Sequence, residues 1–225
     1  MKKDGYKKKT SFQEKIQDFA VKHGHYVPPT KKDYLREVEL LQKQALKRNG
    51  KFHKSISIGR SHFTFVYNNL NIKVGTKLVQ RYESEYRQDT FVKVKFNLKC
   101  KFRLSVYIRD ISFFRTEDIT TYPNLGITQH LLGLKESETL KSEFNKKFIV
   151  KTNDESISIN LLKYDVQNQL IDIENEYFYP VININKKEFL LIAMNRLCDE
   201  KEYDKLINLA IMFLDGLQLL GCFEN

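Results

Sequence analysis

The amino-acid sequence predicts an α+β fold. Apolar residues recur at helical spacing near the beginning of the chain, at every second position in the middle, and in a strand–helix–hairpin–helix order near the end. Strands grouped in this way favour a mainly antiparallel sheet over a doubly wound parallel one. With 225 residues, 41% of them hydrophobic, the chain is long enough to bury one sizeable core.

Two basic helices are expected near the beginning of the chain. Ser11 and Glu14 have the spacing of a capping box and open the first helix. The second begins near Thr30 and ends at Gly50, a residue typical of helix C-termini. We therefore divide the chain into a basic helical segment, residues 1–54, and an α+β domain, residues 55–225. The helices are expected to pack on that domain or to extend from it.

The middle of the chain has the period-two pattern of strands. Short strands are expected around residues 56–58, 63–67 and 70–74, with a turn at Asn68-Asn69. Residues 76–90 are polar and have no clear period, so no element is assigned to them.

The clearest strand pattern lies between residues 92 and 109. Its even-numbered positions from 92 to 108 are all apolar, whereas its charged residues are at odd-numbered positions. Since successive side chains of a strand point to opposite faces, one face enters the core and the other is positively charged. A single strand of this length is unusual, so a bend, bulge or turn is expected near residues 97–101. The basic face consists of Lys93, Lys95, Lys99, Lys101, Arg103 and Arg109.

The remaining elements follow from local patterns. Residues 111–143 are expected to form a mostly irregular connection. A strand at 147–152, a helix at 156–174, a hairpin spanning 181–193 and a closing helix at 200–220 complete the chain.

This last part of the chain resembles a bacterial domain of unknown function. The shared pattern is an F-[DE]-x-x-F-x-V strand entry, an acidic turn and a pair of leucines, followed by a helix, a hairpin and a closing helix. In this chain, Asn145 stands where the family has an acid. The resemblance implies a module that commonly lies on the cytosolic side of an integral-membrane segment or beside other modules, and it supplies no catalytic residues. The matching residues are Phe144-Asn145-Lys146-Lys147-Phe148-Ile149-Val150, Asn153-Asp154-Glu155 and Leu161-Leu162.

The whole chain has a net charge of +10, and its positive charge is concentrated in the first half. Residues 1–54 have 15 Lys/Arg against 6 Asp/Glu, and residues 55–109 have 11 against 3. Residues 110–225 have 12 against 19. This asymmetry indicates attraction to an anionic partner. A lysine-rich composition that reflects AT-rich coding sequence is the alternative explanation.

Several classes of protein are disfavoured by the sequence. The cysteines Cys100, Cys198 and Cys222 are odd in number and have no C-x-x-C spacing, which indicates reduced thiols in a cytoplasmic protein rather than a disulfide framework or a zinc site. Glycine-rich phosphate loops are absent, so no cofactor is expected. We expect no transmembrane segment, because the longest apolar stretch is too short and too polar.

The basic strand face is the leading candidate site. Side chains two residues apart on a strand lie about 6–7 Å apart, a spacing that lets lysines follow a phosphate backbone. A solvent-facing sheet surface, or an edge strand protected from aggregation by lysines, explains the same pattern. A basic N-terminal arm, Lys7, Lys8 and Lys9, is a second candidate, and peripheral contact with an anionic membrane is among its alternatives.

The leading functional hypothesis is a non-enzymatic cytoplasmic binding or accessory module for a protein or anionic partner. Nucleic-acid binding through the basic strand face is one alternative. A metal-dependent nuclease or hydrolase is another, because acids and a lysine of the required types occur together downstream of the strand. Its residues are Asp110, Asp118, Glu136, Glu138 and Lys141.

Overall fold

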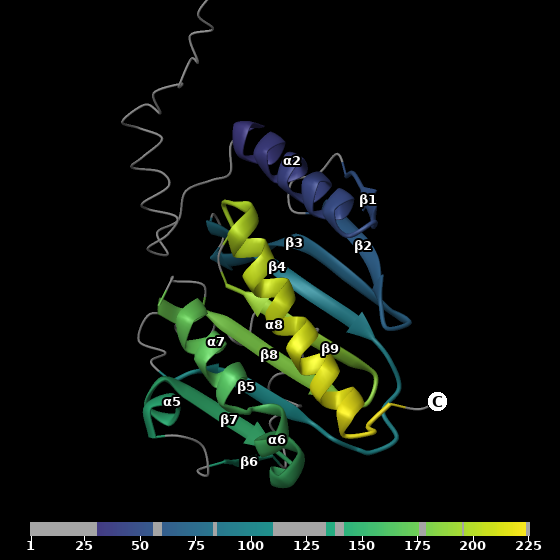
Figure 1. Ribbon diagram of the computed structural model, residues 1–225. Coiled ribbons are helices and arrows are strands. Elements are labelled where there is room, and N and C mark those ends of the chain that lie inside the picture. Colours follow the sequence, from purple (N-terminus) through teal and green to yellow (C-terminus); the bar gives the residue numbers. More distant parts are fainter. Residues whose placement is uncertain are drawn as a thin grey trace, which may run out of the picture.

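The computed structural model describes residues 31–55, 60–82, 85–109, 134–137, 142–175, 179–194 and 196–223. Within these ranges the chain forms five helices and a single nine-stranded sheet (Figure 1). The helices are α2 (Lys31–Lys47), α5 (Ser142–Lys147), α6 (Glu155–Leu161), α7 (Tyr164–Asn175) and α8 (Glu200–Leu219). The strands are β1 (Lys51–His53), β2 (His62–Tyr67), β3 (Leu70–Tyr82), β4 (Glu85–Lys95), β5 (Leu104–Ile108), β6 (Lys135–Glu136), β7 (Phe148–Thr152), β8 (Pro180–Asn185) and β9 (Glu188–Ala193).

The sheet is antiparallel throughout, with the strand order β1-β2-β3-β4-β9-β8-β5-β7-β6. The β8–β9 hairpin is inserted between β4 and β5. Strands β4 and β5, which follow each other along the chain, are therefore separated by β9 and β8 in the sheet. Helices α7 and α8 lie over the same face of the sheet (Figure 1).

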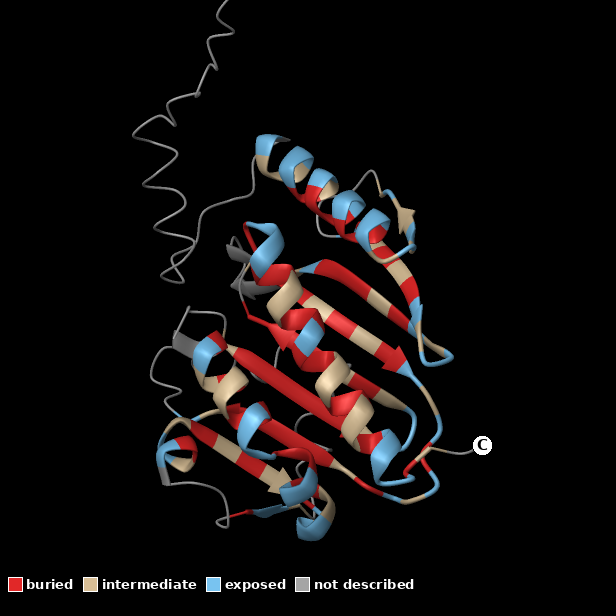
Figure 2. Cartoon of the chain, in the orientation of Figure 1, coloured by how far each residue is buried: buried red, intermediate tan, exposed pale blue. Residues whose placement is uncertain are grey.

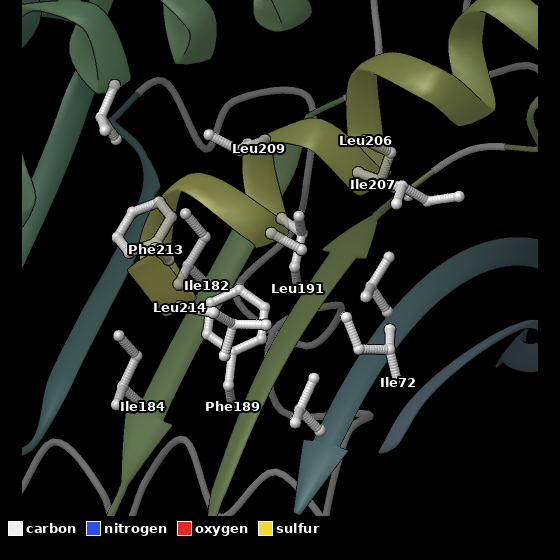
Figure 3. Packing of buried hydrophobic residues seen from close by; sticks show 14 of the residues in the cluster. Ile72, Ile182, Ile184, Phe189, Leu191, Leu206, Ile207, Leu209, Phe213 and Leu214 are labelled. Carbon is white, nitrogen blue, oxygen red and sulfur yellow. The ribbon is translucent and has the colours of Figure 1, made fainter. Parts of the chain in front are cut away.

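Helix α8 supplies much of the core. Its apolar side packs against the inward-facing residues of the central strands, as Figure 3 shows for Phe213 and Leu214 above Phe189. The rings of Phe189 and Phe213 are 5.8 Å apart. Most polar residues of α8 face outward, so buried residues (red) alternate with intermediate (tan) and exposed (blue) ones along this helix in Figure 2. Its buried hydrophobic residues are Tyr203, Leu206, Ile207, Leu209, Ala210, Phe213, Leu214 and Leu217.

Both ends of α8 are fixed by hydrogen bonds. At the beginning, Asp199 and Glu202 form a capping box, in which the Glu202 amide donates to Asp199 Oδ1 (3.0 Å) and the Asp199 amide donates to Glu202 Oε2 (3.2 Å). At the end, Gly221 takes the left-handed conformation (φ +63°), and the Cys222 amide donates to the Leu217 carbonyl at 2.9 Å. This Schellman arrangement reverses the chain direction after the helix.

Helix α2 is held by polar contacts as well as by its apolar side. The carboxylate of Glu37, which is buried, accepts hydrogen bonds from Thr76 of β3 and Gln88 of β4. Burial outweighs these bonds and raises the pKa of Glu37. Near its other end, Lys47 and Arg48 each lie 2.6 Å from a carboxylate oxygen of Asp204 in α8.

The α+β class and the large antiparallel sheet are confirmed. The interruption expected near residues 97–101 is also present, and it divides the long basic-faced pattern into β4 and β5, which are not neighbours in the sheet. Residues 76–82 and 85–90, which have no clear pattern, belong to the long strands β3 and β4. The single helix expected at 156–174 is two helices separated at Leu162-Lys163. The first predicted helix lies outside the described residues.

None of the described helices is both long and apolar enough to cross a membrane.

The buried Glu37 carboxylate predicts a pH-dependent stability difference. Because its pKa is raised in the folded state, the stability of the protein decreases as the pH rises through that pKa. In the variant Glu37→Gln the side-chain amide stays neutral at every pH. The free energy of unfolding of this variant, relative to that of the wild type, should therefore rise from pH 4 to pH 8. Urea unfolding at each pH measures this difference.

The control is Glu37→Leu, which leaves Thr76 and Gln88 without their acceptor and should destabilise the fold by about 1–3 kcal/mol per orphaned group. An advantage of Glu37→Gln that shrinks with rising pH would contradict this account.

Asp204 should have the opposite pH dependence. Partial burial opposes the shift, but Lys47 and Arg48 lower the pKa of this carboxyl below its ordinary value. Its contribution is therefore present above the ordinary pKa of aspartate and lost as the pH falls through the lowered one. Asp204→Asn should destabilise the protein by about 0.5–1 kcal/mol at pH 7, and this loss should become smaller as the pH falls through the lowered pKa. The matched control in the same urea titrations is Asp172→Asn, at an exposed aspartate of α7.

Candidate anion-binding surface

The six basic residues predicted to share one strand face do not form one row. Lys93 and Lys95 belong to β4, Arg109 follows β5, and Lys99 and Lys101 lie in the connection between these strands. Strands β9 and β8 separate the two parts of the row. The predicted face is therefore broken into groups with different surroundings.

Lys93 and Arg109 form ion pairs, and Arg103 is only partly exposed. The ammonium of Lys93 lies 2.7 Å from Glu188 of β9. Arg109 donates to the Asn145 carbonyl (2.8 Å) and to Glu136 Oε1 (2.7 Å), and so joins β5 to α5 and β6. Arg103 is half-buried, and its amide donates to Asn153 Oδ1 at 2.7 Å. We conclude that Lys93 and Arg109 serve mainly to hold the fold together.

The other three lysines, Lys95, Lys99 and Lys101, lie near Lys186 and Lys187. No pattern in the sequence had pointed to these last two. The Phe96 amide donates to the carbonyl of Lys187 (3.0 Å), and the Leu98 amide donates to that of Lys186 (2.9 Å). These bonds hold the β8–β9 turn against the connection that carries Lys99 and Lys101. We refer to the five exposed residues Lys95, Lys99, Lys101, Lys186 and Lys187 as the lysine cluster.

Three structural features position the cluster. The β8–β9 hairpin brings Lys186 and Lys187 to the end of β4, where Lys95 is the last residue. The reversal after α8 lets the Lys99 amide donate to the Cys222 carbonyl at 2.8 Å. The side chain of Asn153 donates to the carbonyl of Lys101 at 2.6 Å. The backbone of the cluster is thus fixed by contacts with three distant parts of the chain.

The cluster has positive charge that the fold does not neutralise. Across the described residues, no carboxylate lies within ion-pairing distance of any of the five ammonium groups. Lysine ammonium groups at a protein surface attract anions without strict geometric requirements. The cluster is therefore the best candidate for binding a negatively charged partner.

A histidine pair lies elsewhere on the sheet, where β1 pairs with β2. His53 and His62 are directly opposite each other, and their rings stack with centroids 4.7 Å apart. Burial, together with the positive charges of Lys73 and His53, lowers the pKa of His62. Among the residues that the structure describes, no group of three or more His, Cys, Asp or Glu is placed to hold a metal ion.

Among the described residues, two surface hollows are each lined by acidic and basic side chains. One, of about 510 Å³, lies between α2 and the beginning of α8, and Lys43 there is paired with Glu39 (3.2 Å) and Glu200 (3.5 Å). The other, of about 220 Å³, lies between β6 and the beginning of α6. Cys198 lines the larger hollow, but no histidine is among the lining residues of either. Neither hollow joins a thiol or hydroxyl to a histidine base.

The remaining candidate residues have no described geometry. Lys7, Lys8 and Lys9 lie outside the described residues, as do Asp110, Asp118, Glu138 and Lys141 of the nuclease hypothesis. Glu136, the other acid of that hypothesis, is engaged by Arg109.

Comparisons with known proteins identify no family. No family model matches the chain, and no curated protein matches it. Among solved structures, the crystal structure of the mycobacterial trehalose monomycolate transport factor A is similar, with a TM-score of 0.48 and 8% sequence identity. The similarity covers 84% of this chain and 98% of that chain. It is too low to transfer a function.

The different surroundings of Arg109 and Lys99 predict different effects of neutralising them. Arg109→Gln removes the contacts to Asn145 and Glu136 and should lower the melting temperature by about 2–4 °C. Lys99→Gln should leave the melting temperature within about 1 °C of the wild type, because only the main chain of this residue is engaged. On heparin–agarose, Lys99→Gln should elute at lower salt than Arg109→Gln, and the reverse order would contradict the assignment of the two residues.

Proposed function

We propose that this protein is a non-enzymatic cytoplasmic binding module that holds an anionic partner at the lysine cluster. The observation that carries this proposal is the convergence of five exposed lysines from β4, the β4–β5 connection and the β8–β9 turn. Like charges repel one another, so such a cluster adds nothing to the stability of the fold by itself. An anionic partner would relieve this repulsion.

The distribution of charge along the chain supports the same proposal. The net positive charge comes from residues 1–109, whereas residues 110–225 have an excess of acids. The cluster adds two lysines from the acidic part of the chain to three from the basic part. A surface that gathers lysines from a segment with excess acid is not explained by composition alone.

Nucleic acid is less well supported as the partner than an anionic surface in general. Proteins that bind single strands combine basic grooves with aromatic side chains on which bases stack. The aromatic residues nearest the cluster are turned inward, since Phe102 is buried and Phe96 packs edge-on against Phe223 with ring centroids 5.3 Å apart. Nothing in the described residues favours the nuclease alternative, whose one described acid is paired.

A salt titration tests the proposal. The full chain should bind heparin at low salt, and the triple variant Lys99→Gln, Lys101→Gln, Lys186→Gln should elute from heparin at clearly lower salt than the wild type. The matched control changes three exposed lysines outside the cluster, Lys51, Lys54 and Lys201, to glutamine. Equal losses in the two triple variants would show a general charge effect, and no binding at low salt would end the proposal.

A further inference from the structure

Aliphatic side chains are exposed beside the lysine cluster. Leu219, in the last turn of α8, is 82% exposed, and the next residue, Leu220, is 38% exposed. Exposed apolar residues that gather at one place on a protein mark contact surfaces more often than scattered ones do.

The end of α8 places its two leucines outward for a definite reason. In a Schellman arrangement the inward positions are those three residues before the cap and two after it. Here Leu217 and Cys222 occupy these positions, and both are buried. Leu219 and Leu220 lie between them on the outer side of the reversal. Their exposure is therefore a product of the same geometry that brings Cys222 to Lys99.

The aliphatic residues and the lysines lie at the same end of the sheet. The side-chain amide of Asn68, at the hairpin tip, donates to Gln218 Oε1 at 3.2 Å and so places the tip beside the end of α8. Figure 1 shows the β2–β3 hairpin, the β4–β5 connection and the end of α8 together on the right of the molecule. The hairpin tip and the last turn of α8 are both exposed in Figure 2.

We infer that the anionic partner is a lipid bilayer with negatively charged headgroups. The lysines would lie at the headgroup level, and Leu219 and Leu220 would enter the apolar boundary beneath it. Peripheral membrane surfaces combine cationic and aliphatic side chains in this way, because each contributes a different part of the attraction. This inference rests on the proposed function and names its partner.

The shape of the surface favours a bilayer over a protein or a nucleic acid. A peptide partner needs a groove or a free sheet edge, and the two hollows found among the described residues are lined by none of the cluster lysines. Bases need stacking partners, whereas the exposed apolar residues here are aliphatic. A lipid surface requires only that the charged and aliphatic groups face one way.

A single introduced tryptophan tests the insertion directly. The chain contains no Trp, so the fluorescence of Leu219→Trp reports on this position alone. Vesicles of phosphatidylcholine with phosphatidylserine should shift its emission to the blue, and vesicles of phosphatidylcholine alone should not. The matched control is Leu46→Trp, at a leucine that is 71% exposed on α2. Its emission should stay unchanged, and equal shifts at both positions would overturn the assigned orientation.

Sedimentation with the same vesicles separates the two parts of the surface. Lys99→Gln, Lys101→Gln, Lys186→Gln should weaken vesicle binding by roughly a hundredfold and heparin binding as well. Leu219→Ser with Leu220→Ser should weaken vesicle binding by at least about tenfold and leave heparin binding unchanged. Circular dichroism melts of each variant confirm that the fold is retained.

The outcomes distinguish this inference from the proposal on which it rests. Binding to heparin through the cluster without binding to phosphatidylserine vesicles overturns the lipid inference and leaves the proposed function. Tighter binding to single-stranded DNA or polyglutamate than to the vesicles, with no effect of Leu219→Ser and Leu220→Ser, also overturns it. Binding to neither heparin nor vesicles overturns both.

Discussion

The packing of α8 across the sheet is the interaction on which the rest of the structure depends. Its apolar side covers the central strands, so the helix determines the thickness and direction of the main core. Its two ends then organise different regions. The first turns bind α2 through Asp204 and Glu200, and the last turn leads into the reversal that brings Cys222 against Lys99. The same helix therefore places both the polar contacts of α2 and the lysine cluster.

These two regions differ in how their charges are balanced. Around α2, basic groups are matched within the fold: Lys47 and Arg48 are paired with Asp204, and Arg196 lies 2.8 Å from Asp33. At the lysine cluster, the ammonium groups form no ion pair with a carboxylate in the described part of the chain, although Glu188 lies opposite Lys95 across the strands. The basic groups near the first turns of α8 are thus paired within the fold, whereas those near its last turn are not. This contrast is more informative than the net charge of the chain, because it shows where positive charge is not paired with a carboxylate.

Local patterns in the sequence predict the elements well but not their neighbours. The hairpin at 181–193, the closing helix and the Asn68-Asn69 turn follow from turn residues and spacing, and Asn68 and Asn69 have the positive φ that such a turn requires. Strands β3 and β4 are missed over 76–90 because their polar residues hide the alternation. Lys186 and Lys187 could not be grouped with Lys99 from the sequence, because their proximity depends on a long-range strand insertion. A run of lysines in a turn normally indicates only solvent exposure, so no local pattern distinguished these two.

The insertion of the β8–β9 hairpin has a consequence for synthesis of the protein. Strand β4 leaves the ribosome long before β9, its partner, whose first residue is Glu188. Until then β4 has an unpaired edge, and Val92 and Val94 have no α8 to cover them. Pairing of β4 with β5, which emerges next, would close the sheet without the hairpin and exclude it. The nascent chain must therefore keep β4 and β5 apart, and unpaired edges of this kind are where intermediates aggregate. The central sheet is completed only after the β8–β9 hairpin has been made.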